Sequence, residues 1–178
     1  MTASFGTKRG AAAAAALLGL AAAGVAGQNP SGPGPDPRWL KADSAAQTAE
    51  FQLIAGLTDL SSGLNFNGYR AGGLTLTVPQ GWTVVLHFQN HDPALFHSVE
   101  VIPARDMPMG PVTPSFPHAA THSLDIGLPP GGKEDVQFVA AKAGDYSVFC
   151  AVPGHGAAGM WIRFSVSVAA DRPTLTAP

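Results

Sequence analysis

The sequence predicts an all-β protein built as a β-sandwich, and three observations lead to that fold class. The chain has 178 residues, of which 21 are glycine and 16 are proline. This abundance of turn-forming residues disfavours a helical bundle, and the length suits one domain with a substantial core. Between the turn signals lie short segments in which apolar and polar residues alternate. Several such segments joined by Gly/Pro turns are typical of two packed sheets.

Alternation is clearest in two segments. In 160–168 the apolar residues from Met160 to Val168 occupy every second position, and polar residues occupy the other face. In 82–89, Trp82, Val84, Leu86 and Phe88 alternate with polar side chains such as Thr83 and His87. Strict alternation places one face of a strand on a core and the other in water. The remaining strands are predicted over 49–55, 72–78, 97–102, 134–140 and 145–150.

Two segments depart from this pattern. The alanines of 43–50 favour a short helix, although no cap marks its start. Residues 103–122 contain five prolines. A segment of that length and composition is predicted to be an irregular loop or insertion.

The N-terminal region has the features of a targeting segment. Lys8 and Arg9 precede an apolar run over 11–26, and small residues end it. This order predicts an export signal over residues 1–27 and an extracytoplasmic, for example periplasmic, location. The run is short for a transmembrane span, and an uncleaved N-terminal membrane anchor is the alternative. The Pro/Gly-rich residues 28–38 are predicted to be a linker, 39–169 the folded domain and 170–178 a C-terminal tail.

Charge and cysteine content exclude some classes of function. The formal net charge is −2 at pH 7. A nucleic-acid-binding domain would instead concentrate Lys and Arg on one face. Exported proteins often contain paired cysteines, but Cys150 is the only cysteine and cannot form an internal disulfide. It is therefore inert, bonded to another molecule, or a metal ligand.

The residues around Cys150 favour the ligand interpretation. The stretch F-C-A-V-P-G-H-G-A-A-G-M-W places Cys150, His155 and Met160 at C-x4-H-x4-M spacing. Cys150 ends one predicted strand facing inward, Met160 begins the next, and a glycine-rich loop between them can fold back. His97, at the start of another predicted strand, supplies a fourth donor. Two imidazoles, a thiolate and a thioether form the donor set of a blue-copper site, whereas structural zinc prefers more thiolates.

The same residues resemble a known family. The pattern F-x-N-x6-H-S-V from Phe88 to Val99, followed by Y-S-V-F-C-A-V-P-G-H-G-A-A-G-M-W, resembles the type 1 copper cupredoxins. It is most similar to the sulfocyanin and rusticyanin group, and L-N-F-N-G-Y at 64–69 with L-T-L-T-V-P-Q-G-W-T-V at 74–84 points further to sulfocyanin. The resemblance covers about residues 39–168. It implies a Greek-key β-sandwich, one copper ion, electron carriage in a respiratory chain, and turn and strand over 38–50.

Further expectations concern residues around the donor set. Ser98 and Asn90 are expected to hydrogen-bond near the cysteine and its loop, the alternative being a solvent-facing serine and a similarly uninvolved asparagine. A set of apolar residues in the proline-rich segment is expected to form a collar for a docking partner near His155: Met107, Pro108, Met109, Pro111, Phe116 and Pro117. Packing over the end of the sandwich is the alternative, and it is favoured for Phe116. The remaining histidines, 87, 91, 118 and 122, are not predicted to bind a second metal.

These observations predict a mononuclear blue-copper protein that carries single electrons and is not an enzyme. Its expected partners are redox proteins such as a cytochrome or a terminal oxidase. A multicopper oxidase would need histidine ligands beside the cysteine, but Cys150 is flanked by Phe149 and Ala151. A binuclear copper site would need two cysteines. The alternative is a copper chaperone of the same fold, which Met107 and Met109 would permit.

Overall fold

A computed structural model describes residues 1–3, 29 and 34–178 of the chain. Residues 4–28 and 30–33, which include most of the predicted export signal and part of the predicted linker, therefore lie outside the described residues. Within the described ranges, no helix is long and apolar enough to cross a membrane.

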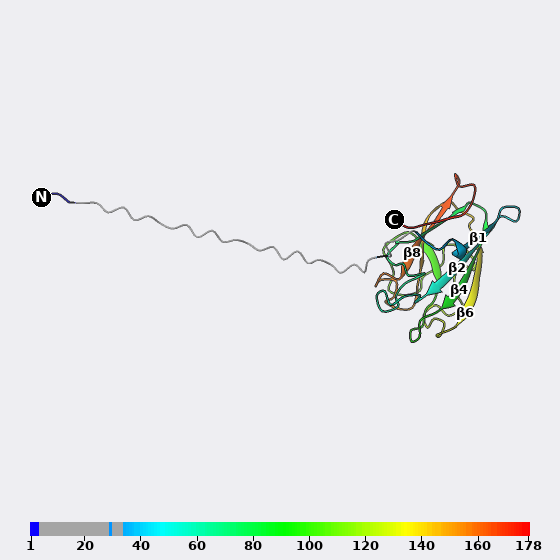
Figure 1. Cartoon of the computed structure of the whole chain (residues 1–178), viewed down its shortest axis with the longest axis horizontal. Coiled ribbons are helices and arrows are strands. Elements are labelled where there is room, and N and C mark those ends of the chain that lie inside the picture. The colour runs from blue at the N-terminus through cyan, green and yellow to red at the C-terminus, as the bar shows by residue number, and fades with distance from the viewer. Residues whose placement is uncertain (4–28, 30–33) are drawn as a thin grey trace.

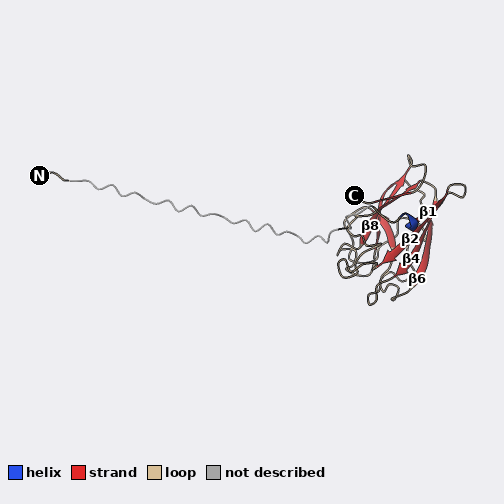
Figure 2. Cartoon of the chain, in the orientation of Figure 1, coloured by secondary structure: helices blue, strands red, loops and turns tan. Residues whose placement is uncertain are grey.

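The described part of the chain is built from strands, as predicted (Figure 2). It contains one short 3-10 helix and nine strands: η1 (Pro37–Trp39), β1 (Leu40–Asp43), β2 (Thr48–Ala55), β3 (Thr75–Pro79), β4 (Thr83–Asn90), β5 (Glu100–Pro103), β6 (Lys133–Val139), β7 (Gly144–Phe149), β8 (Trp161–Ser167) and β9 (Thr174–Thr176).

The strands form two mixed sheets. The first has the order β1-β2-β4-β6, and these strands lie side by side in Figure 1; the second has the order β5-β7-β8-β3-β9. The pairs β2/β4 and β3/β8 are parallel, and the other paired neighbours are antiparallel. Apolar side chains from both sheets pack into one core, which includes Phe51, Leu53, Leu76, Leu86, Ile162 and Phe164. The predicted Greek-key β-sandwich of the cupredoxin type is confirmed.

The predicted alternation of buried and exposed residues is correct along the whole of β4 and along β8 as far as Ser167. Every second residue of β4 is buried, and the buried residues include Val84, Leu86 and Phe88. In β8 the alternation ends early, because the strand stops at Ser167. Val168, predicted to lie on the buried face, is 78% exposed. That single position was wrong because the chain leaves the sheet there.

The helix predicted over 43–50 is wrong, and the turn and strand implied by the family resemblance are correct. Asp43 ends β1, and its Oδ1 accepts hydrogen bonds from the backbone N–H groups of Ala45 and Ala46 (both 2.9 Å). This side-chain turn competes with a helix for the same donors. Gln47 then adopts a φ of 50°, and β2 returns antiparallel to β1. Ala45 and Ala46 lie in the hairpin turn, and Ala49 lies in β2.

Residues 103–122 form no strand beyond Pro103, as predicted, but they pack on the domain at two places. Phe116 enters the main core, where its ring centroid lies 5.4 Å from Phe138 and 4.8 Å from Tyr146. Met107 and Val112, with Leu124, pack on a small second cluster formed by Ile102, Phe149 and Ala151. This cluster covers the outer face of the second sheet directly behind Cys150.

The C-terminal residues 170–178, which the sequence predicts as a tail, include β9. This strand pairs antiparallel with β3 and forms the edge of the second sheet.

Candidate metal centre

The structure brings together three of the four predicted donors at one end of the sandwich. His97 lies on the segment before β5, Cys150 directly follows β7, and His155 lies in the loop between β7 and β8. One ligand atom from each residue lies within 4.8 Å of the other two. Among the described residues, these three are the only group of three or more His, Cys, Asp or Glu side chains close enough to hold a metal ion.

The distances within this group fit a single small ion. The Cys150 Sγ lies 3.8 Å from His97 Nδ1 and 3.5 Å from His155 Nδ1. Bonds of about 2.0 Å to nitrogen and about 2.3 Å to sulfur, at about 120°, would separate the two donors by about 3.7 Å. The two imidazole rings are 5.2 Å apart at 55° and both present Nδ1 to the sulfur. The donor set and its spacing therefore fit one ion.

Met160 lies at the base of the same loop. Its backbone oxygen accepts a hydrogen bond from Cys150 N (3.0 Å), and its own N–H donates to His155 O (3.0 Å). Its side chain is fully buried in the main core. Met160 is thus bonded through its backbone to both Cys150 and His155, in the place where the sequence predicts the weak axial ligand.

Backbone hydrogen bonds close the loop from Cys150 to Met160. His155 N donates to Val152 O, Ala158 N to Gly154 O, and Gly159 N to Gly156 O. Gly159 has a φ of 102°, and a Cβ there would lie 2.4 Å from the Arg70 guanidinium. Arg70 itself donates to Ala158 O. The loop is therefore held by its own backbone and by the neighbouring segment.

Comparison with known proteins identifies the family of this chain. Residues 36–177 match the family described as the sulfocyanin (SoxE) domain, which is well over half of the chain. The chain belongs to the sulfocyanin family. It is 28% identical over 138 residues to the sulfocyanin of Sulfolobus acidocaldarius, covering 74% of this chain and 68% of that protein. A crystal structure of rusticyanin variants matches 72% of this chain and 86% of its own, with a TM-score of 0.53 and 22% identity.

The family and the donor set together assign one type 1 copper ion to this centre. Two imidazoles and one thiolate are the strong ligands of such sites, and a buried thioether is the usual weak fourth donor. In this cupredoxin the three strong donors lie close together and Met160 adjoins them. The residues present therefore fit the ion that the family implies.

Ser98 organises the polar groups around the sulfur, as predicted. Its backbone N–H donates to Cys150 Sγ (3.3 Å), and its side-chain hydroxyl donates to Leu124 O (2.8 Å). The same hydroxyl accepts from Ala151 N (3.1 Å) and lies 3.9 Å from Cys150 Sγ. Ser98 thus connects the His97 segment, the cysteine loop and the segment of Leu124 that follows the proline-rich insertion, and the alternative of a solvent-facing serine is excluded.

A Ser98→Ala variant is expected to lose about 2 kcal/mol of unfolding free energy, because it leaves the part-buried carbonyl of Leu124 and the buried N–H of Ala151 without partners. Chemical denaturation of the metal-free chain measures this loss. Ser123→Ala, at an exposed serine next to Leu124 in sequence, is the matched control and should change stability little. Equal stability of the two variants would contradict the structural role given to the Ser98 hydroxyl.

Asn90 is hydrogen-bonded at the end of β4, but its partners are on the His97 side of the centre and not in the predicted cysteine loop. Its side-chain amide donates to Leu95 O (2.8 Å) and Leu128 O (2.9 Å). Leu128 forms an isolated bridge with His97. Asn90 therefore fixes the segment that carries His97, rather than the loop that carries His155.

The strand predicted to begin at His97 begins at Glu100 instead. The backbone between these residues has other partners: Ser98 N bonds the sulfur, and Val99 N bonds Thr121 Oγ1 (3.1 Å). Thr121 N in turn donates to Val99 O. Ser98 and Val99 thus bond to the thiol and to Thr121 instead of to a neighbouring strand. The alternation of apolar and polar residues in the sequence does not show this change of partners.

Burial sets the protonation of the donors in the metal-free protein. Burial lowers the pKa of His97 to about 4, with His155 adding to this effect and Asp92 opposing it. Burial also lowers the pKa of His155 and raises that of Cys150, although the Ser98 N–H partly offsets the latter. Both imidazoles are therefore neutral near pH 7 and able to bind a metal, and the thiol gives up its proton when a metal binds.

Two buried acids near the centre were missed from the sequence. Asp92 lies in the turn after β4 and is buried against His97. Glu100 is fully buried, under the proline-rich insertion. A charged residue inside a predicted strand, as in H-S-V-E-V, was the signal available for Glu100.

The predicted apolar collar is only partly correct. Met109 is 69% exposed, and its backbone oxygen accepts from Gly154 N (2.9 Å) beside His155. Met107 instead packs on the cluster behind Cys150, and Phe116 lies in the main core. Pro117 lines a hollow with Val139, near Thr83 at the opposite end of β4 from Asn90. The segment therefore supplies Met109 to the copper end and core packing elsewhere.

The other histidines lie away from the centre. His122 Nδ1 contacts Glu134 (2.6 Å), and His87 lies between Asp135 (2.8 Å) and Glu50 (3.5 Å). His91 and His118 are exposed.

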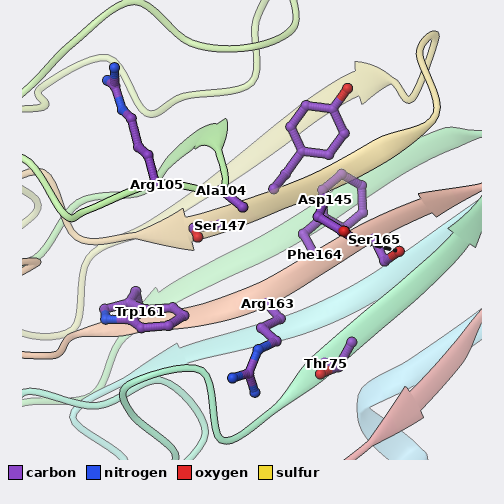
Figure 3. Close-up of a pocket in the computed structure, with 10 residues that line it drawn as sticks. Thr75, Ala104, Arg105, Asp145, Ser147, Trp161, Arg163, Phe164 and Ser165 are labelled. Carbon is purple, nitrogen blue, oxygen red and sulfur yellow. Dashed lines mark hydrogen bonds between the residues drawn. The ribbon is translucent and has the colours of Figure 1, made fainter.

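A hollow of about 380 Å³ lies on the outer face of the second sheet, and none of the four predicted ligands lines it. Arg105 and Arg163 extend from it in opposite directions, and Trp161 lies flat along β8 (Figure 3). The Arg163 guanidinium donates a hydrogen bond to Gly72 O, and its Cζ lies 6.0 Å from the centroid of the Trp161 ring.

Proposed function

We propose that this protein is a blue-copper electron carrier in which His97, Cys150, His155 and Met160 hold the ion. The observation that carries the proposal is the convergence of two imidazoles and the only thiol of the chain within 4.8 Å. Copper bound by such donors accepts and releases one electron without bonding to a substrate. The proposed role is accordingly that of a carrier and not of an enzyme.

The residues of the centre suit this role because they are fixed and dry. His97, Cys150 and Met160 are fully buried, whereas His155 is half-buried. Backbone hydrogen bonds hold the loop, so the donors need little rearrangement between charge states. The partly exposed His155 ring gives the centre its contact with the surface.

The surface around His155 supports docking of a protein partner. Phe96 is 43% exposed and Ile126 66% exposed, and they flank the bridge between His97 and Leu128. Met109 is also exposed, and its backbone oxygen accepts from the N–H of Gly154, the residue before His155. An exposed apolar patch of this kind suits brief encounters with a redox protein such as a cytochrome or an oxidase subunit.

A Met109→Lys variant is expected to slow electron exchange with such a partner several-fold, because a charge replaces an apolar contact beside His155. Stopped-flow oxidation of the reduced protein by its partner measures the rate. Val139→Lys places the same charge on a half-exposed apolar residue at the other end of the sandwich and should leave the rate unchanged. Equal rates for both variants would contradict docking at Met109.

We also propose that the protein works outside the cytoplasmic membrane, in a respiratory chain. Support comes from the basic start, the apolar run over 11–26 and the small residues that follow, which have the order of an export signal. Fractionation of producing cells, with mass determination of the N-terminus, distinguishes a cleaved signal from a retained anchor. Recovery of the full-length chain from the cytoplasm would contradict this location.

Adding Cu(II) to the purified protein tests the proposed function directly. A carrier gives an intense visible band with one equivalent of copper and cycles through repeated redox titrations without losing the metal. A chaperone of the same fold would instead bind Cu(I) and transfer it to an acceptor. Buried Cys150 disfavours that alternative, because a thiol that transfers copper must be reached by its acceptor. Loss of copper on each reduction would overturn the carrier role.

A further inference from the structure

The buried carboxylate of Asp92 is fixed by its own turn. Asp92 lies two residues after β4, and its N–H donates to Asn90 Oδ1 (3.0 Å). Its Oδ1 accepts from the backbone N–H groups of Ala94 (2.8 Å) and Leu95 (2.7 Å). Oδ1 therefore accepts two hydrogen bonds, and these bonds fix the orientation of the carboxylate and with it the position of Oδ2.

The second oxygen of Asp92 is aimed at a predicted copper ligand. Asp92 Oδ2 lies 3.5 Å from Nε2 of His97, the imidazole nitrogen that does not face the sulfur. The other ring nitrogen, Nδ1, lies 3.8 Å from Cys150 Sγ. The His97 ring thus bridges the carboxylate and the thiol through its two different nitrogens.

Two glycines close the space around this carboxylate. A Cβ at Gly63 would lie 2.0 Å from Asp92 Oδ2, and one at Gly56 would lie 2.6 Å from Asp92 Cβ. Both have positive φ, of 87° and 64°. Only residues without a side chain allow the chain to approach so closely, so water is excluded from the contact.

The carboxylate of Asp92 acts as an acceptor in this setting, because its Oδ1 already accepts from two backbone N–H groups. An ionised carboxylate accepts hydrogen bonds and cannot donate one. The group facing it must therefore present a proton.

We propose that Asp92 is a positioning residue that keeps the His97 proton on Nε2, so that the Nδ1 lone pair faces Cys150 and the copper ion. The inference rests on the proposed function, in which His97 is a ligand. Outer carboxylates that accept from a ligand imidazole fix its tautomer and orientation and raise its basicity. The negative charge of Asp92 also favours the more positive oxidation state of copper.

An Asp92→Asn substitution separates the charge from the shape. The single carbonyl oxygen of asparagine would remain with the N–H groups of Ala94 and Leu95, and its NH2 group would face His97 Nε2. A donor cannot bond another donor, so the His97 proton moves to Nδ1, the position needed for the metal. The variant keeps the size of the side chain and inverts the tautomer.

The test uses ¹⁵N NMR of the imidazoles in the whole metal-free chain, followed by copper titration and a redox titration. We expect His97 to carry its proton on Nε2 in the unaltered protein and on Nδ1 in Asp92→Asn. Copper(II) affinity should fall about 10- to 100-fold, the usual effect of losing such a partner. The reduction potential should shift upward, which a purely structural role would not require.

The matched control is Asp135→Asn, which alters another carboxylate–histidine contact. Asp135 Oδ1 lies 2.8 Å from His87 Nδ1 on the first sheet, away from the copper ligands. This control should retain the His97 tautomer, copper affinity and potential of the unaltered protein. Circular dichroism shows whether Asp92→Asn is folded. If it is not, the His97 tautomer measured by NMR in the unaltered protein still tests the proposal.

A His97 proton on Nδ1 in the unaltered metal-free protein would overturn the role of Asp92, as would unchanged affinity and potential in Asp92→Asn. Neither result contradicts the proposed function, provided that the unaltered protein binds copper and shows an intense visible band. Absence of that band would instead contradict the proposed function. The tautomer measurement needs no copper and distinguishes the two cases.

Discussion

A Cys150→Ser variant should lose the intense visible absorption of the copper-loaded protein completely. That absorption arises from charge transfer between a thiolate sulfur and Cu(II), and Cys150 is the only cysteine of the chain. No other residue can supply a thiolate. A serine hydroxyl is a harder and much weaker donor, so copper affinity should fall as well. Optical spectra of the protein titrated with Cu(II) measure both effects.

The substitution is suited to this test because it leaves the surroundings in place. Cys150 is fully buried between β7 and the ligand loop, and a serine hydroxyl can still accept from Ser98 N. Met160→Leu is the control variant: it removes the predicted weak thioether but keeps the thiolate, so the band should persist. Colour retained in Cys150→Ser would show that the thiolate assignment is wrong.

The second large effect concerns Glu100, which lies at the start of β5 beneath the proline-rich insertion. Burial raises the pKa of Glu100 to about 7, while the N–H of Val112 and the charge of Arg105 act in the opposite direction. Both carboxylate oxygens lie near the same Val112 N–H, at 3.3 and 3.2 Å. A single shared N–H group stabilises a buried carboxylate only weakly, so the neutral acid is favoured.

The sign of the pH dependence follows from this raised pKa. Between the ordinary pKa of 4.5 and about 7, the folded chain binds a proton at Glu100 that the unfolded chain releases. The contribution of Glu100 to stability is therefore complete below pH 4.5 and is lost as the pH rises to about 7. A difference of that size corresponds to about 3 kcal/mol of unfolding free energy.

A Glu100→Gln variant should remove this loss, because glutamine still accepts from Val112 and cannot ionise. Denaturant unfolding of the metal-free protein at about pH 4.5 and about pH 8 measures the difference between the two chains. The lowered pKa of buried His97 makes the free energy of unfolding fall at low pH. This effect is the same in the unaltered protein and in Glu100→Gln, so it cancels in the comparison. Glu50→Gln, at a part-exposed carboxylate of the first sheet, should retain the pH dependence of the unaltered protein. A parallel pH profile in Glu100→Gln would contradict the buried acid.

Local sequence patterns predicted most of the sandwich. The alternation in β4 and β8 reports a half-buried strand directly, and the C-x4-H-x4-M spacing reports a loop that brings donors together. The family resemblance added the turn at 44–47, where alanine content alone favoured a helix. These features depend on residues close together in the chain, so the sequence is sufficient for them.

Features that depend on distant segments were not predictable in this way. Phe149 and Ile102 are buried on the outer face of their sheet because the insertion covers them, although strand phase alone would leave that face in water. His97 leaves the strand ladder because Thr121 and the Cys150 sulfur occupy the neighbouring backbone. Asp92 faces His97 only because a turn and two glycines direct its carboxylate. Each case needs a contact that sequence spacing does not encode.

A crystal structure of the copper-loaded protein tests the central claim most directly. The expected result is one ion bonded to His97 Nδ1, Cys150 Sγ and His155 Nδ1, with the Met160 sulfur as the weaker fourth neighbour. An ion that lies elsewhere, or one that contacts only one of Cys150 and His97, would contradict it.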